Sequence, residues 1–350
     1  MNLSKNPAAT VALVALAFVM ACGAEADKED SLAPPPAEGG FQLDLGTFQL
    51  AAASEAMYCL KVPVPAPYSD TPFTISGIDS DLAFGTHHFF MAHNPTPLSK
   101  REPCIGDSPL VPFENDLEDS ERPDHEGLSE GKLVFGAGVG EYSYRMPQGY
   151  GMAIPDPGHF VTSHHVLNLT DSEVTIHGRF NVYTQPLSET PHPTNILNCD
   201  NRDISVDPQT QAEISGTCTV PFDLDLVLVA SHAHAYLTKF EARIYDGEKT
   251  LEEVIYTNYQ WDSPNISIMD PPISLKKGMG ITFTCHYNNH TNHELEYGFG
   301  KYGEMCASMN GYAYPTDRTF EVPPSLGTII FNRDKPTPLL DTTKLEGIQF

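Results

Sequence analysis

Short apolar runs that alternate with polar residues dominate the chain from about residue 45 onward. The clearest is "FDLDLVLVA" (222–230), in which two aspartates alternate with Leu224, Leu226 and Leu228. A period of two is typical of β-strands that bury one face. The pattern therefore predicts a strand here, with the three leucines on its buried face.

Similar runs recur along the chain, among them "FTISGI", "GHFVTSHHVLNL", "EVTIHGRFNVYT" and "GITFTCHY". Turn residues separate them, and the chain holds 30 prolines and 26 glycines. Frequent proline and glycine disfavour long helices, and we find no convincing helical pattern of ten residues or more. The sequence predicts an all-β fold of two tandem antiparallel β-sandwich domains, jelly-roll-like in kind.

The segment "SETPHPTNILNCDNRD" (188–203) interrupts the strand pattern and is the candidate domain boundary. Residues 23–40 are acidic, rich in proline and glycine, and lack apolar periodicity, which is typical of a flexible tether. The expected organisation is a signal peptide (1–21), a tether (22–44), an N-terminal sandwich (45–195), a C-terminal sandwich (196–335) and a tail (336–350).

The N-terminus has the features of an export signal. Lys5 precedes the apolar run "ATVALVALAFVMAC", which is too short for a membrane span. "VMAC" followed by glycine resembles a bacterial lipobox, with Cys22 as the acylated first mature residue. We therefore expect a lipid-anchored protein of the bacterial cell envelope. The alternative is an ordinary cleavable signal in which Cys22 is incidental.

The chain is strongly acidic, with a formal net charge of −26. Nucleic acids and anionic membrane surfaces are bound through basic patches, so neither is an expected partner. Membrane contact is expected only through the N-terminal lipid, and we expect a monomer.

Six cysteines remain after Cys22 is set aside, and an even number in an exported chain favours disulfides over thiolate metal ligands.

Three close histidine pairs stand out among the 14 histidines, in "FGTHHFFMAH", "FVTSHHVLNL" and "VASHAHAYL". Residues two apart on a strand point to the same side, so His232 and His234 can bind one metal ion. Adjacent residues face opposite ways, so His87 and His88 can do so only at a bulge or strand end, which Gly85 permits. Taken singly, each pair could equally be a surface doublet. Imidazoles without thiolates suit copper especially well.

A methionine adds a possible soft ligand. Met305 directly precedes Cys306 in "GEMCASMNGY". A disulfide between Cys285 and Cys306 would hold Met305 in one orientation, and a thioether suits Cu(I). The alternative is that Met305 fills core space, as most methionines do.

Taken in order, these features resemble the copper type II ascorbate-dependent monooxygenases, which include peptidylglycine α-hydroxylating monooxygenase and dopamine β-hydroxylase. The family pattern is an adjacent histidine pair, a later single histidine on a strand, His-x-His, and Met directly before Cys. The segments "AMYCLKVPVP" and "YRMPQGYGMAI" add further matches, and the resemblance covers roughly residues 45 to 315.

The resemblance implies two copper ions per chain, with ascorbate or an equivalent one-electron donor as co-substrate. It implies hydroxylation by O2 of an activated C–H bond in a small organic substrate. It also implies one ligand set in each sandwich, with solvent between the two. The electron-storing copper would be held by His87, His88 and His165, and the catalytic copper by His232, His234 and Met305.

The third ligand of the first set is a choice between His164 and His165. The family places an Asn or a similar residue three positions after the ligand, and Asn168 follows His165 by three. By alternation His165 shares its face with Val161, Leu167 and Leu169, an inward face by pattern. His165 is the preferred ligand, with His164 as the alternative.

The chain departs from the peptide-amidating relatives at three positions. Those relatives carry an Arg two residues before His-x-His, and an Asn and a Tyr shortly after Met-Cys, which hold the peptide carboxylate. Here these positions are Ala230, Ala307 and Met309. We therefore expect no clamp for a terminal carboxylate and no peptidylglycine substrate.

The cysteines depart from the family as well, because none follows Cys306 to pair with Cys218. Besides the pair Cys285 and Cys306, we consider Cys199 with Cys218, which leaves Cys59 with Cys104.

Two other functions stay open: a non-catalytic copper-binding or storage lipoprotein on the same scaffold, and a structural protein with incidental histidines. Met91, His93 and His286 are expected to be ordinary packing or surface residues.

Overall fold

The computed structural model describes residues 32–104, 106–112, 131–298, 302–313 and 328–331. The expected signal peptide, the lipidation site Cys22 and the tail (336–350) lie outside these residues. Apart from two short 3-10 turns, η1 (Tyr68–Asp70) and η3 (Leu187–Glu189), the described residues form strands and loops with no α-helix. No helix in the described part of the chain is long and apolar enough to cross a membrane. The prediction of an all-β fold is confirmed.

The strands fall into two sets along the chain, which we call the first half and the second half. The first half comprises β1 (Gly40–Leu50), β2 (Ser54–Pro63), β3 (Phe73–Leu82), β4 (Thr86–Asn94), β5 (Glu102–Pro103), β6 (Leu110–Pro112), β7 (Lys132–Ala137), β8 (Gly140–Arg145), β9 (Tyr150–Ile154), β10 (His159–Asn168) and β11 (Val174–Pro186). The second half comprises β12 (His192–Asn201), β13 (Ser205–Val206), β14 (Thr210–Thr219), β15 (Leu224–Ala233), β16 (Leu237–Tyr245), β17 (Thr250–Asn258), β18 (Ser267–Leu275), β19 (Gly280–Asn289), β20 (Leu295–Tyr297), β21 (Gly303–Glu304), β22 (Cys306–Ala313) and β23 (Thr328–Phe331).

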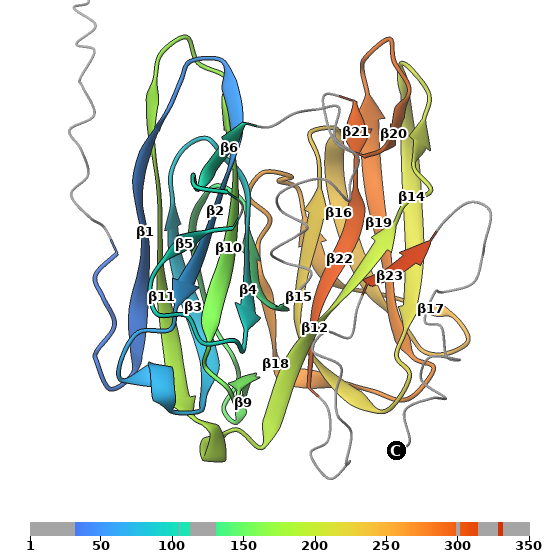
Figure 1. The fold of residues 1–350 in the computed structure, drawn as a ribbon. Coiled ribbons are helices and arrows are strands. Elements are labelled where there is room, and N and C mark those ends of the chain that lie inside the picture. Colours follow the sequence, from blue (N-terminus) through green and yellow to red (C-terminus); the bar gives the residue numbers. More distant parts are fainter. Residues whose placement is uncertain (1–31, 105, 113–130, 299–301, 314–327, 332–350) are drawn as a thin grey trace, which may run out of the picture. The chain divides into compact units, whose positions relative to one another are not determined.

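Two larger sheets build the first half. A six-stranded sheet runs β5-β2-β10-β4-β7, with β6 beside β2, and Figure 1 shows β2, β10 and β4 side by side. The opposing strands β1, β11, β3 and β9 begin a ten-stranded sheet that continues through β12, β22, β15 and β18 of the second half. The remaining two strands of this sheet are β8, beside β3, and β23, beside β12. A four-stranded sheet, β14-β19-β16-β17, and a small sheet, β13-β20-β21, complete the second half.

Each half has its own hydrophobic core. In the first half, Phe89 of β4 stacks on Phe180 of β11 with ring centroids 4.3 Å apart, which joins the two facing sheets. In the second half, Phe240 and Phe283 stack beneath the buried side chains of β15 and β22. Two cores fit the expected pair of sandwiches, although the ten-stranded sheet links the halves. The division into domains stays a prediction.

The structure differs from the expected boundaries at two places. Residues 192–201 of the presumed break form β12, which pairs with β22, so the chain passes between the halves within a regular strand. The expected tether (22–44) overlaps β1, which begins at Gly40 and pairs with β11. The polar composition of residues 188–203 hid β12, because pairing satisfies backbone groups whatever the side chains are. The start of β1 follows the same alternation as the later strands, with Phe41, Leu43 and Leu45 buried.

Three disulfides tie neighbouring strands and loops together. The pairing is the one expected from the sequence. The pairs are Cys59 with Cys104, Cys199 with Cys218, and Cys285 with Cys306.

A turn with the same hydrogen bonds occurs once in each half, after β10 and after β19. Asn168 donates to the carbonyls of residues 50, 51 and 172, and Asn289 donates to those of residues 206, 207 and 293. Each amide oxygen accepts from the backbone and hydroxyl of the threonine two residues on. The sequence showed no obvious repeat between the halves, yet both halves close this turn in the same way.

We predict that Asn289→Ala lowers the free energy of unfolding by at least about 2 kcal/mol, because it leaves several buried carbonyls and amides without partners. Asn289 is fully buried, whereas its neighbour Asn288 is exposed. Denaturant unfolding of Asn289→Ala beside the control Asn288→Ala measures the difference. Equal midpoints for the two variants would show that the turn contributes little.

Candidate metal centre

Two adjacent histidines of β4 reach the same side of the sheet because the strand contains a bulge. His88 pairs with His165 of β10, whereas the next residue of β10 pairs with Thr86, so His87 is an extra residue. Gly85, just before this bulge, has a φ of 93°, a conformation that favours glycine. A bulge redirects the side chains of a strand, so adjacency does not keep the two imidazoles apart.

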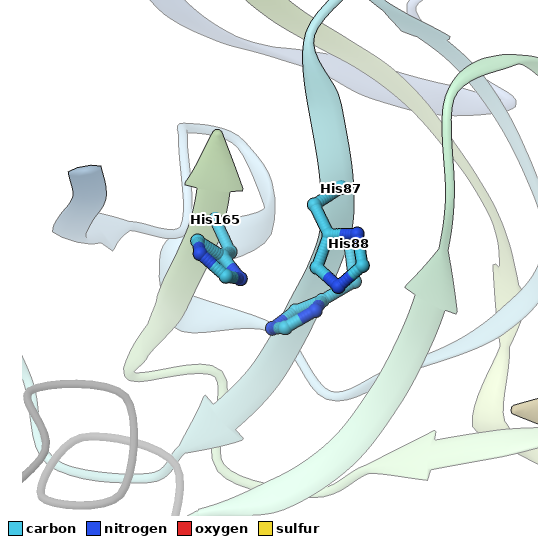
Figure 2. A group of neighbouring side chains, drawn as sticks. All are labelled: His87, His88 and His165. Carbon is cyan, nitrogen blue, oxygen red and sulfur yellow. The ribbon is translucent and has the colours of Figure 1, made fainter. Parts of the chain in front are cut away.

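Figure 2 shows His87 and His88 on β4 and His165 on the neighbouring strand, with their side chains turned toward one another. The ring centroids lie 5.1 Å, 5.0 Å and 4.7 Å apart. One potential ligand nitrogen from each ring lies within 4.8 Å of the other two. Ligands about 2 Å from an ion at tetrahedral angles are roughly 3.3 Å apart. Small side-chain adjustments would therefore suffice to bind one ion.

The two candidate histidines of β10 have separate places. His164 is fully buried in the first half, where its Nε2 donates to Thr86 Oγ1 at 2.8 Å and its ring packs against Phe89. His165 lies on the opposite side of β10, with His87 and His88. The expectation that His165 shares the core-facing side is wrong, because that side carries His164 and Phe160.

A carboxylate orients His165. Its Nε2 lies 2.7 Å from Oε1 of Glu55, and the His165 side chain is only 4 % exposed. An ionised carboxylate only accepts, so Nε2–H donates and a metal ion would be bound through Nδ1. Carboxylate partners of this kind fix the tautomer and the orientation of metal-binding histidines.

A second bulge directs the histidines of β15. The register of β15 shifts between Leu226 and Leu228. Leu226 packs into the core of the second half, whereas Leu228 packs into that of the first. The expectation that all three leucines lie on one buried face is therefore wrong, because Leu228 lies on the opposite face from Leu226. His232 and His234, in phase with Leu228, turn toward the first half.

The two predicted ligand groups meet in one cluster. The ring centroids of His232 and His234 are 5.4 Å apart, and those of His87 and His234 are 5.6 Å apart. His88 and His232 lie 6.0 Å apart. The expectation of solvent between the two groups is wrong, because rings this close leave no room for a layer of water.

Met305 is placed by strand pairing. Ala233 of β15 pairs with Cys306 of β22, and His234 and Met305 adjoin this last pair just beyond the two strands. The backbone N–H groups of both residues donate to the carboxylate of Glu304, which holds them close together. Met305 is 9 % exposed, and the disulfide of Cys306 with Cys285 anchors the residue after it.

A buried carboxylate links His234 to Met305. Glu304 accepts from the backbone N–H groups of Tyr236 at 2.7 Å, His234 at 3.0 Å and Met305 at 3.3 Å. Burial raises the pKa of Glu304 to about 7, although the three N–H groups act in the opposite direction. The Nδ1–H of His234 donates to the carbonyl of Gly303 at 3.0 Å, so a metal ion would be bound through Nε2.

Four imidazoles of the cluster have pKa values held far below the usual range of histidine. Burial, followed by the neighbouring histidines, lowers the pKa of His87 to about 2, and the same causes lower the pKa of His232 to about 3. Burial lowers the pKa of His234 to about 4 and that of His88 well below its usual range. Neutral imidazole is the form that binds metal ions.

His88 provides the test of whether these residues fit a metal ion. Both of its ring nitrogens are buried, and no group among the described residues hydrogen-bonds to either. A buried polar group of this kind requires a partner, and a metal ion shared with His87 and His165 would supply one. Imidazole ligands suit copper, as they suit zinc, iron and nickel.

Sequence reasoning missed three residues of the site. Glu304 stands directly before Met305, and Trp261 is the single tryptophan, so both carried a signal that could have been noticed. Nothing near Glu55 marks it, because its histidine lies far along the chain. Trp261 lies against His87 with ring centroids 5.6 Å apart.

The other residues considered lie away from the cluster. Met91 is fully buried in the core of the first half. His93 has Nε2 2.7 Å from the carbonyl of Pro157. His286 lies near Glu213 and Glu241, with separations of 3.2 Å and 3.5 Å.

Fold and site together define an all-β protein with a buried imidazole cluster suited to a metal ion. Residues 195–321 match the C-terminal domain of the copper type II ascorbate-dependent monooxygenases. This segment contains His232, His234 and Met305, and the resemblance noted in the sequence is confirmed over it. No curated protein matches the chain at a significant level.

Two viral proteins are among the solved structures that the chain matches. The major capsid protein P2 from bacteriophage PM2 has 8% sequence identity, with 79% of this chain and 98% of that chain covered and a TM-score of 0.32. The STIV MCP also has 8% identity, with 81% and 99% covered and a TM-score of 0.36. Scores this low say nothing about function.

We predict that Glu304→Gln destabilises the protein by about 1–3 kcal/mol, because an amide donor replaces an oxygen that accepts backbone N–H groups. The variant should also bind Cu(I) more weakly, since His234 and Met305 lose a shared anchor. Thermal unfolding and a competitive Cu(I) titration at pH 8.5 would measure both effects. Glu296→Gln, exposed on β20, is the control. Wild-type behaviour of Glu304→Gln would mean that the carboxylate does not position these ligands.

Proposed function

We propose that this protein is a copper-dependent monooxygenase that hydroxylates an activated C–H bond of a small organic substrate. One oxygen atom of O2 enters the C–H bond. The other leaves as water with two protons and with two electrons from a reductant such as ascorbate. We propose two coppers per chain, one bound by His87, His88 and His165, and one by His232, His234 and Met305.

The observation that carries this proposal is the convergence of five histidines, from β4, from β10 and from the C-terminal end of β15 with the residue just after it, in one buried cluster. These residues are far apart in sequence, and a fold without a use for them would pay a penalty for burying so many imidazoles. The match of residues 195–321 to the family's C-terminal domain supports the same chemistry.

Bound copper would supply one-electron transfer and the activation of O2. The chain's own residues prepare the ligands for it. Burial lowers the pKa of four of the imidazoles, so these stay neutral. Glu55 fixes the tautomer of His165, and Glu304 holds the backbone of His234 and Met305. The thioether of Met305 would favour Cu(I) at the catalytic position.

The central test is oxygen consumption by the copper-loaded protein with ascorbate. We expect Met305→Ala to abolish it while the protein stays folded, because the soft ligand is lost. Met269→Ala is the matched control, since both methionines are 9 % exposed and both lie in the second half. X-ray absorption should show two coppers per chain, with sulfur near one of them in reduced wild-type protein only.

Two outcomes would contradict this proposal. Copper bound tightly without any oxygen consumption would favour the alternative of a copper-binding or storage protein. Equal melting temperatures with and without copper would mean that the native state binds none, because a ligand of the native state must stabilise it.

We also propose that the protein is exported to the bacterial cell envelope, anchored by a lipid on Cys22 and monomeric. The lipobox-like "VMAC" supports the anchor, and three disulfides suit an oxidising compartment. We expect Cys22→Ala to abolish incorporation of labelled palmitate and to move the protein from the membrane fraction to the soluble fraction. An unchanged distribution would favour an ordinary cleavable signal.

A further inference from the structure

A small cavity lies beside the histidine cluster and is bounded by both halves. His87, His88 and His232 form one side of it, and the other walls include Phe90, Met309 and Ile266. Its free volume is about 30 Å³, whereas one water needs roughly 10–15 Å³. The cavity therefore admits a small chemical group and not a whole large molecule.

The walls offer no charged partner. None of the residues that line the cavity is Asp, Glu, Lys or Arg. Besides the histidines, the polar groups of the lining are the indole N–H of Trp261 and the hydroxyl of Ser231, which contacts Tyr256 at 3.1 Å and Asn258 at 3.0 Å. A charged group that entered would lose its hydration without compensation.

Strand pairing brings the wall residues together. Ala230 of β15 pairs directly with Met309 of β22, so both share the face of His232. Gly136 of β7 gives the opposite wall its space. A Cβ there would lie 3.1 Å from the ring of Phe90 and 3.4 Å from the methyl group of Met309. The small residues at 136 and 230 thus leave open the room that larger side chains would fill.

A segment of the second half completes the enclosure. The carbonyl of Asp262 accepts from the N–H of Val139 at 2.9 Å, and the hydroxyl of Ser263 donates to the carbonyl of Val139 at 3.1 Å. These bonds tie residues 261–266 to the turn after β7, and Trp261 and Ile266 then line the cavity.

We infer that this cavity receives a small, uncharged, apolar group of the substrate, so that the reacting C–H bond belongs to a hydrocarbon-like end. Met309 and Ala230 are the residues that determine this specificity. The inference rests on the proposed function for the reaction, but the binding preference follows from the walls alone. Substrates whose end nearest the cluster carries a carboxylate or an ammonium group are excluded.

Trp261 allows the preference to be measured without copper. It is the single tryptophan of the chain and lies in the cavity wall against His87. The metal-free full-length protein is titrated with 1-butanol, butyrate and butylammonium, which share a four-carbon chain, and Trp261 fluorescence is followed. We expect 1-butanol to bind at least tenfold more tightly than either ion. Equal affinity for the three probes would overturn the inference.

A variant reverses the preference if the inference holds. Met309→Lys places a cation in the wall on an unbranched side chain of similar length, and butyrate should then bind at least tenfold more tightly than 1-butanol. Ala230→Leu, which fills the room beside Met309, should abolish binding of all three probes and serves if the lysine variant does not fold. An unchanged order of affinities in a folded variant would refute the assignment of the walls.

The two proposals fail separately. A preference for 1-butanol in a protein that never consumes oxygen would leave the cavity assignment intact and remove the monooxygenase. Oxygen consumption by a protein that binds the three probes equally would support the monooxygenase and refute the cavity assignment.

Discussion

Two bulges decide where the predicted ligands lie, and the site depends on them. Without the extra residue His87 in β4, His87 and His88 would point to opposite faces of the sheet. Without the register shift after Leu226 in β15, His232 and His234 would face the core of the second half. Because a strand alternates strictly, one extra residue is enough to turn a whole set of side chains over.

The cluster also depends on keeping imidazoles uncharged and oriented in a buried place. Burial makes the charged form unfavourable, and neighbouring rings add to this effect. Two carboxylates then act in different ways: Glu55 contacts an imidazole directly, whereas Glu304 accepts from three backbone N–H groups. The same buried surroundings leave a cavity beside the cluster. Residues that surround the metal-binding histidines therefore also line the cavity that would select the substrate.

Much of the site could be predicted because its residues carry strong signals in the chain. The pairs of histidines, the Met-Cys step and their order are visible without any structure, and so is the all-β character. The preference for His165 over His164 agrees with the geometry, although part of the reasoning was wrong. His165 lies on the side of β10 away from the core, and the other half of the molecule covers it.

The sequence by itself determined the residue types, their order and the alternation that makes strands, since these depend on neighbours a few positions away. Only the tertiary structure decided that both histidine groups form one cluster, that β12 crosses a presumed linker, and that Glu55 and Trp261 join the site. Those facts depend on strand register and on packing between distant segments. A bulge of one residue changes both, while leaving the local composition almost unaltered.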